Sequence, residues 1–265
     1  MPSQQVYIDH LLLQFSQEQF ETLPRWILDN FTVIDGGVHT GGLSRNKLII
    51  FRDGTYLELY NWITKPEDWR ERLPGDFALT TLNPITAEAS QERIANALAS
   101  DPGDGGVGVT YSRPRKAAAK TPKGSMCAGR LLSQGIPRRT RRPGTNSIRE
   151  GAQMRRFSAM ISLRHPSGAT GIERIDVVVP RGGLSRYSDV YASIVGAAPE
   201  ERDGAIEFRL SAPGVHSFYG SLRVQEAKTA EDEQFLRQKG IGISSLALRS
   251  ETGQPISFSI AEFLQ

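Results

Sequence analysis

The sequence predicts an α+β fold in which one strand and one helix are followed by three further strands. Three observations carry this prediction. Apolar and polar residues alternate over 46–62 around a turn signal, as in a β-hairpin. An apolar strand over 8–15 precedes apolar residues at helical spacing, and residues 171–180 repeat the pattern of 8–16. With 265 residues, the chain is long enough for one large domain or two ordinary ones.

The hairpin over 46–62 is the strongest local signal. Asp53-Gly54 between its two strands predicts a type I′ turn, because both residues readily take positive φ. In the second strand Glu58 shares a face with aromatic residues, and leucines occupy the other face. The aromatic residues are Tyr56, Tyr60 and Trp62. A carboxylate there needs a donor, an opposite charge or a metal ion; the alternative is an edge strand with Glu58 in water.

The N-terminal residues predict a buried strand over 8–15 and an amphipathic helix over 17–31. Ser16 and Gln19 have the spacing of a capping box. Pro24 predicts a restart of the helix, because proline is tolerated in a first turn and not in a helix interior. A glycine-rich bend over 36–42 leads into the hairpin.

His10 on the first strand and Glu58 on the last can point into one concave face of a small sheet. Imidazole and carboxylate are ordinary ligands for a divalent metal ion. A histidine alone on an apolar strand is more often a hydrogen-bonded core residue, so both interpretations stay open at this point.

Three segments, IDHLLLQF, GGVHTGGLSRNKLI and DGTYLEL, resemble the glyoxalase-like domain family of the vicinal oxygen chelate (glyoxalase/bleomycin resistance/dioxygenase) superfamily. The resemblance covers residues 6–63. It implies βαβββ modules that form cupped, mixed β-sheets with flanking helices, and a divalent metal ion held by His10 and Glu58. The residues to which it assigns substrate contacts are His39, Asn46, Tyr56 and Tyr60.

The same resemblance organises the whole chain. It implies a glyoxalase-like domain over 5–165, with module one at 5–63 and module two at 75–165. Residues 166–265 are expected to form a third βαβββ-like module.

Module two has a weaker pattern than module one. No histidine occupies its expected first strand, residues 76–82. Residues 123–163 are rich in Arg, Gly and Ser and have poor periodicity, so we expect irregular structure there and no further strands.

The third module repeats the order of strand and helix. Its first strand puts Arg174 at the place of His10, so this copy cannot supply that ligand. A helical stripe follows over 184–195. The remaining predicted elements are strands over 205–210, 221–226, 243–249 and 255–263 and a helix over 231–239.

Charge and composition narrow the classes of partner. The formal net charge is +3, yet 14 Arg and Lys residues and a single acid, Glu150, lie between Tyr111 and His165, so the rest of the chain is acidic. The basic segment lacks interleaved aromatic residues and any recognisable nucleic-acid module, so we expect no nucleic-acid partner.

The sequence also predicts a cytoplasmic protein without a membrane segment. No apolar run approaches the ~20 residues of a membrane span, and the first residues lack the features of a signal peptide. The single cysteine, Cys127, excludes an intrachain disulfide and a cysteine-based zinc site.

Two functions fit these observations. The first is a divalent-metal-dependent enzyme of the lyase, isomerase or dioxygenase type that acts on a small oxygen-rich substrate. Thr80 and Glu226 are candidates for a further metal ligand. The second is a non-catalytic module that binds a small molecule, or an inactive product of a disrupted gene. A second copy could complete an odd number of modules, so a homodimer is one expectation.

Residues 123–163 also have features of a shifted reading frame. For 125–133 and 157–162, synonymous codons exist for which one common shift yields strand-like sequences similar to the family. The alternative is a natural basic loop. Transcript sequencing over 120–165 tests this hypothesis: a gene-model error or a splice variant predicts a frame change at both ends, and an uninterrupted frame in related genes would refute it.

Overall fold

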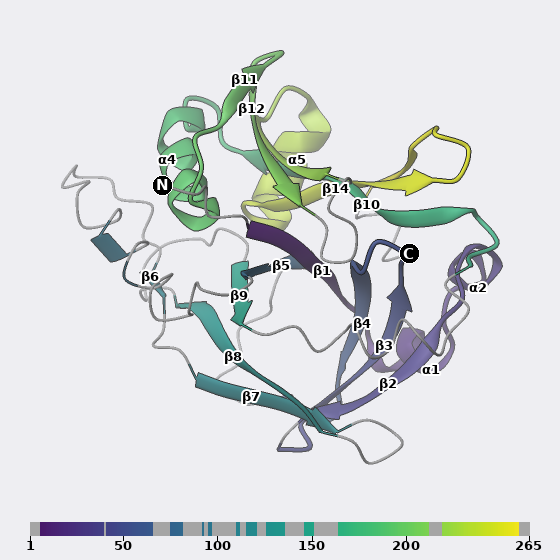
Figure 1. Ribbon diagram of the computed structural model, residues 1–265. Helices are drawn as coiled ribbons and strands as arrows, with labels where there is room; N and C mark the ends of the chain where they lie inside the picture. Colours follow the sequence, from purple (N-terminus) through teal and green to yellow (C-terminus); the bar gives the residue numbers. More distant parts are fainter. Residues whose placement is uncertain are drawn as a thin grey trace.

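The computed structural model describes a mixed β-sheet protein with short helices on the outside of the sheet (Figure 1). The residues that it describes are 6–39, 41–65, 75–81, 92, 95–96, 110–111, 115–120, 126–135, 146–150, 164–211 and 219–259. Within them, no helix has the length and apolar character needed to cross a membrane.

Among the described residues, eight strands pair in a closed ring. Pairing runs β1–β4–β3–β2–β7–β8–β9–β5, and β5 returns to β1. The ring fills the lower half of Figure 1. Its strands are β1 (Val6–Gln14), β2 (Ile34–His39), β3 (Ser44–Ile50), β4 (Tyr56–Trp62), β5 (Gly75–Thr81), β7 (Arg115–Lys120), β8 (Met126–Gly135) and β9 (Asn146–Glu150), and β6 (Thr110–Tyr111) pairs with β8 off the ring.

The strands of module two correct the prediction for residues 123–163. We expected irregular structure, yet β8 and β9 lie in this stretch. β5 pairs with β9 in parallel, and β9 pairs with β8 antiparallel, as β1 does with β4 and β4 with β3. The prediction failed because main-chain hydrogen bonds between neighbouring strands do not require periodic side chains. The reading frame itself stays a hypothesis.

The third module has the predicted order of elements. It consists of β10 (Ala169–Val179), α4 (Leu184–Val195), β11 (Glu200–Arg202), β12 (Ala205–Ser211) and β13 (Tyr219–Glu226), followed by α5 (Ala230–Lys239), β14 (Gly242–Ser250) and β15 (Ile256–Ser259). β10 pairs with β13 in parallel and with β14 antiparallel, which repeats the pairing of β1 with β4 and β5.

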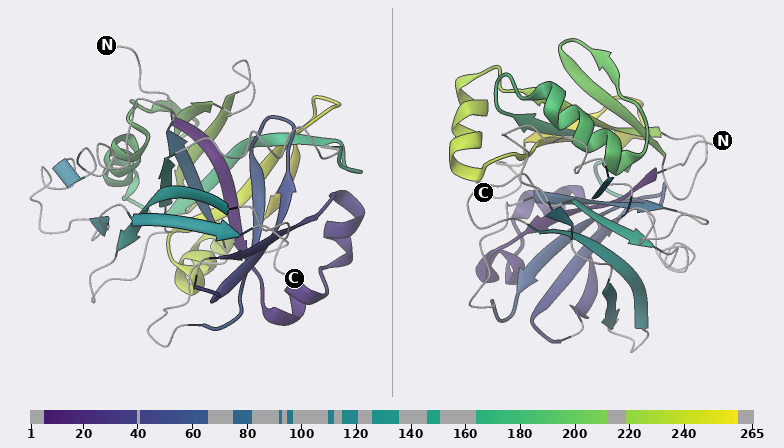
Figure 2. Two further views of the ribbon diagram at one scale, coloured as in Figure 1. Left: turned by 60° about the horizontal axis from the view of Figure 1, so that its bottom comes forward. Right: turned by 90° about the vertical axis from the view of Figure 1, so that its left-hand side faces the viewer.

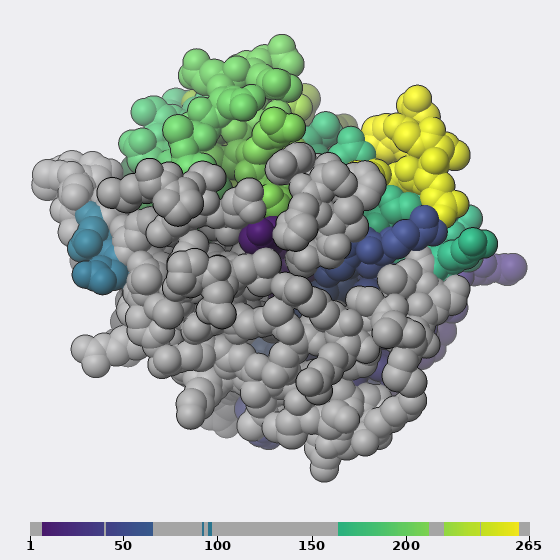
Figure 3. Space-filling view, in the orientation of Figure 1, coloured from purple at the N-terminus to yellow at the C-terminus, as the bar shows by residue number. Residues whose placement is uncertain are grey.

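The third module lies above the ring, and its residues form an upper lobe in the space-filling view (Figure 3). One parallel pairing joins the two parts, between Tyr7 of β1 and Ser211 of β12. Helix α4 packs on β12 and β13, and α5 packs on β10 and β14. Figure 2 shows both helices against this sheet. Apolar residues such as Leu222 and Val224 are therefore buried on the helix side.

The predicted helix over 17–31 is found as two short helices, α1 (Gln17–Glu21) and α2 (Arg25–Asn30). Ser16 and Gln19 form the predicted capping box, and Pro24 is the N-cap of α2, so proline does restart the helix. Phe20 and Ile27 are buried against the core. The helices therefore cover the outer face of β1, β3 and β4.

The turn between β3 and β4 corrects the type I′ prediction. That turn needs positive φ at both central residues, but here φ is positive at Gly54 (88°) and not at Asp53. The amide of Gly54 donates to Phe51 O, and that of Phe51 donates to Thr55 O. The Asp53 carboxylate instead accepts from the backbone amide and the hydroxyl of Thr55, which favours a longer loop.

This loop holds module one against module three. Asp53 is buried, and Arg249 of β14 donates to its Oδ2 atom at 3.2 Å. The Thr55 hydroxyl accepts from the amide of Ile172 on β10 at 3.1 Å. A Cβ atom at Gly171 would collide with the Asp53 carboxylate, so only glycine allows this approach. Burial raises the pKa of Asp53, and the bonds from Thr55 and Arg249 oppose that rise.

His165 fixes the segment that enters module three. Its Nδ1 atom accepts from the amide of Thr32 at 3.1 Å, and its Nε2 atom lies 3.0 Å from Ile50 O and donates to it. Because both nitrogens have these roles, the imidazole is neutral. Burial lowers the pKa of His165 accordingly, and Arg52 adds to the effect. The segment that enters module three is therefore hydrogen-bonded to the residue Thr32 after α2 and to the end of β3.

We predict that Arg249→Met lowers the free energy of unfolding by about 3–5 kcal/mol, because it leaves Asp53 buried without its counter-charge. Urea denaturation at neutral pH measures this loss. Arg52→Gln is the matched control, since Arg52 pairs with Glu251 in the same region with side chains 49% and 53% exposed. This variant should lose less than about 1 kcal/mol. Equal losses in the two variants would contradict the prediction.

Candidate functional site

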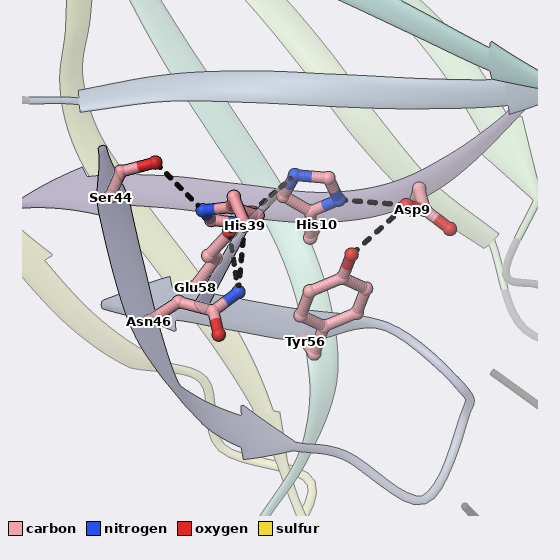
Figure 4. Close-up of polar contacts among 7 residues, drawn as sticks. All are labelled: Asp9, His10, His39, Ser44, Asn46, Tyr56 and Glu58. Atoms are coloured by element: carbon pink, nitrogen blue, oxygen red, sulfur yellow. Dashed lines mark hydrogen bonds and ion pairs between the residues drawn. The ribbon is translucent and has the colours of Figure 1, made fainter. Parts of the chain in front are cut away.

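The Glu58 carboxylate is the centre of a polar cluster inside the ring (Figure 4). Its side chain is 2% exposed. The Nδ2 atom of Asn46 donates to Oε1 at 2.7 Å, and His39 Nε2 lies 3.2 Å from the same oxygen. His10 Nε2 lies 3.1 Å from Oε2. The predicted convergence of His10 and Glu58 is therefore found, although their role as metal ligands stays a prediction.

Four adjacent strands bring these side chains together. In the parallel pair β1–β4, His10 is opposite Tyr56 and Leu12 is opposite Glu58. In the antiparallel pair β3–β4, Asn46 is opposite Tyr60. Alternation then places His10, Asn46, Glu58 and the aromatic residues on the face away from α1 and α2. This face is the inner face of the ring.

A β-bulge in β1 adds Asp9 to the cluster. β5 pairs Leu79 with Ile8 and Ala78 with His10, so Asp9 is the extra residue. Its Oδ2 atom lies 2.7 Å from His10 Nδ1 and accepts from the Tyr56 hydroxyl at 3.4 Å. Sequence reasoning missed Asp9 because adjacent residues of a regular strand point to opposite faces. Its position next to His10 is the one signal that could have found it.

Aromatic rings line the cluster on the β4 side. Tyr56 stacks on His10 with a centroid distance of 4.5 Å and an interplanar angle of 22°. Tyr60 stacks on His39 at 5.6 Å and meets Trp62 edge-on at 5.2 Å. All four residues with predicted substrate contacts, His39, Asn46, Tyr56 and Tyr60, therefore lie within one cluster; their roles stay predictions.

His39 reaches the cluster from the end of β2. A register shift between Asp35 and Gly37, where φ is 147° at Gly37, turns the strand so that His39 faces Glu58. Its Nδ1 atom contacts the Ser44 hydroxyl at 2.9 Å. The His39 side chain is 23% exposed, more than those of His10 and Glu58. Ser44 is a second site residue that the sequence did not indicate.

The hydrogen bond to Asp9 decides which ring nitrogen of His10 carries a proton, and so whether Nε2 faces Glu58 as a donor or as an acceptor. Asp9 is an acceptor when ionised, so His10 Nδ1 must carry the proton that it shares with Asp9. A neutral His10 then directs the Nε2 lone pair at Glu58 Oε2, which is also an acceptor. Two acceptors 3.1 Å apart require a cation between or beside them. That cation is either a second proton, carried by His10 or by Glu58, or a bound metal ion.

Further ligands are not evident in the described part of the chain. There, no three or more His, Cys, Asp and Glu side chains are grouped so as to hold a metal ion. The carboxylate of Glu226, one of the two candidates for a further ligand, accepts from backbone amides at the start of α4, among them that of Leu184. These backbone bonds lower the pKa of Glu226. The side chain of Thr80, the other candidate, lies outside the described residues.

Gly36 gives Asn46 the room to reach Glu58. A Cβ atom at position 36 would collide with Asn46 Oδ1 and lie 2.8 Å from its Cγ atom. The same carboxamide donates to Glu58 and lies 3.4 Å from His39 Nε2. Gly36 is therefore a positioning residue that acts through Asn46.

We predict that Gly36→Ala destabilises the protein by about 1–3 kcal/mol, because it displaces a half-buried, hydrogen-bonded carboxamide. In the Asn46→Ala background most of this cost should disappear, since the colliding group is gone. Urea denaturation of the four proteins of this cycle gives the coupling free energy. The same cost in both backgrounds would show that Gly36 does not act through Asn46.

Comparison with known proteins identifies the fold family. A family model described as a glyoxalase-like domain matches residues 8–193. Among solved structures, a hypothetical protein from Staphylococcus aureus is 16% identical, with 84% of this chain and 87% of that chain covered and a TM-score of 0.55. A triple mutant of 4-hydroxymandelate synthase from Streptomyces coelicolor is 14% identical. The match covers 94% of this chain and 71% of the synthase chain, with a TM-score of 0.53.

These structural matches show the fold alone, because their identities are low. A search of curated proteins finds no matching sequence. The family model covers more than half of the chain. The chain belongs to the glyoxalase-like domain family.

Proposed function

We propose that His10 and Glu58 hold a divalent metal ion and that the chain is a metal-dependent enzyme of the lyase, isomerase or dioxygenase type. The observation that carries this proposal is the pair of facing acceptors, His10 Nε2 and Glu58 Oε2, 3.1 Å apart. A bound cation satisfies both atoms at once.

The residues present fit such an ion in their chemistry. Imidazole and carboxylate suit a borderline divalent ion. Asp9 fixes the ring orientation of His10 through a hydrogen bond to Nδ1. A carboxylate in this position is a usual partner of a metal-binding histidine. Asn46 holds Glu58 through its other oxygen. Two protein ligands leave coordination positions open for a substrate and for further ligands.

The surrounding side chains fit a small, planar, oxygen-rich substrate. Tyr60 and Trp62 present aromatic faces next to the cluster, and His39 is partly exposed beside Glu58. Tyr56 is engaged with His10 and Asp9, so it orients the site and helps to exclude water. A bound metal ion would supply a Lewis acid that polarises neighbouring oxygens of the substrate.

A non-catalytic binding module is the second candidate. One specific observation favours it: within the part of the chain that the structure describes, no group of three ligating side chains surrounds a common point. In this case His10 carries a second proton and bridges the Asp9 and Glu58 carboxylates. The aromatic residues would then bind a small molecule without turnover.

We predict that at least one of Mn²⁺, Zn²⁺, Ni²⁺ and Fe²⁺ raises the melting temperature of the full chain. A ligand at 100 times its Kd stabilises the folded state by about 2.7 kcal/mol. His10→Ala and Glu58→Gln should each abolish the shift, because each removes one ligand. Differential scanning fluorimetry and isothermal titration calorimetry measure the effect.

Asp29→Ala is the matched control, because Asp29 is a carboxylate 62% exposed on α2 and should bind no metal ion. Its melting temperature should respond to the metal as the unchanged protein does. If none of the four ions shifts the melting temperature, the binding module is the better interpretation. A shift that survives in both site variants would place the ion elsewhere.

A further inference from the structure

The third module carries a counterpart of the module-one site with different chemistry. β10 pairs with β13 and β14 as β1 pairs with β4 and β5. The bulge is repeated as well: β14 pairs Leu248 with Ile172 and Ala247 with Arg174, so Glu173 is the extra residue, as Asp9 is in β1. β-Bulges are frequent next to active sites, where they re-aim a side chain. In this copy the bulge places Arg174 opposite Ala247, as the bulge in β1 places His10 opposite Ala78.

The register also identifies the counterpart of Glu58. In module one, Glu58 is opposite Leu12, two residues after His10. In module three, Arg223 is opposite Asp176, two residues after Arg174. An imidazole and a carboxylate are thus replaced by two guanidinium groups. This exchange reverses the charge that the position attracts, from a cation to an anion.

A buried carboxylate holds Arg174 in place. Asp176 is 4% exposed. It accepts from Arg174 Nε at 2.9 and 3.1 Å through its two oxygens and from the Ser245 hydroxyl at 2.6 Å. Because Arg174 uses its Nε edge, its other N–H groups are directed away from Asp176. The Arg174 side chain is 39% exposed, so these groups can reach a ligand.

Arg223 is the second cation of this counterpart. It is partly buried, and it lies directly opposite Glu207 of β12. Nevertheless, its guanidinium makes no hydrogen bond or ion pair with the described residues. A partly buried guanidinium without such a bond has the chemistry of an anion-binding group.

The neighbouring charges limit the size of the anion. On β11 and β12 the charged residues of this face are Glu200, Arg202, Glu207 and Arg209. On β10 and β14, the bulged residue Glu173 adjoins Arg174, and Arg249 is paired with Asp53. The four charges on β11 and β12 cancel, so the excess positive charge of this face comes from Arg174 and Arg223 and is small for a polyanion such as a nucleic acid. A small oxyanion needs only the groups on β10 and β13.

We propose that Arg174 and Arg223 form a binding site for the carboxylate or phosphate group of a small molecule. Asp176 and Ser245 position Arg174 for it. The site lies on the face of the β10–β13 sheet opposite to α4 and α5. It takes an anion where the first module is built for a cation.

Thermal unfolding of the full chain tests the proposal, with inorganic phosphate and malonate as probes at constant ionic strength against chloride. At least one probe should raise the melting temperature with a saturable dependence. Arg223→Gln should weaken apparent binding by about tenfold or more, since one charge-assisted hydrogen bond is lost. Arg174→Gln should do the same. A shift with phosphate only indicates a phosphorylated ligand, and one with malonate only indicates a carboxylate.

Two controls keep the result specific. Arg237→Gln removes a cation that is 65% exposed on α5 and should leave the shift unchanged. His10→Ala should also leave it unchanged, which separates this site from the proposed metal site. Arg223→Gln breaks no hydrogen bond among the described residues, so it should fold. No shift with either probe, or the same shift in Arg223→Gln, would overturn the proposal.

Discussion

The burial of the Glu58 carboxylate is the constraint on which the inner face of the ring depends. A charged group in that position is strongly destabilising unless donors or cations surround it. His10, His39 and Asn46 approach it from β1, β2 and β3, and each depends on a local departure from regular strand geometry or on a missing side chain. These are the bulge at Asp9, the register shift before Gly37, and the absent Cβ of Gly36. The backbone irregularities of module one therefore bring hydrogen-bond partners to the Glu58 carboxylate.

The two copies of this backbone show how one pattern of pairing can support opposite chemistry. The bulge fixes which residue of the first strand faces the parallel fourth strand, whatever that residue is. Module one places an imidazole there against a carboxylate, and module three places a guanidinium against another guanidinium. The fold supplies the positions, and the side chains decide which charge they attract.

The hairpin of β3 and β4 connects the candidate site to the rest of the molecule. Its strands carry Asn46 and Glu58, and its tip carries Asp53, which pairs with Arg249 of β14. His165 binds the end of β3 through Ile50 O. Packing between modules one and three thus orders the same strands that position the carboxylate, so stability and site geometry are linked through one element.

The sequence by itself determined the elements whose side chains alternate strongly or cap locally: the β3–β4 hairpin, the capping box at Ser16 and the restart at Pro24. These features follow from short-range periodicity. Tertiary structure alone decided the turn at Asp53, the strands β8 and β9, and the entry of Asp9 and Ser44 into the cluster. Each depends on which strand lies alongside, and the hydrogen bonds to that neighbour carry no signature in the local sequence.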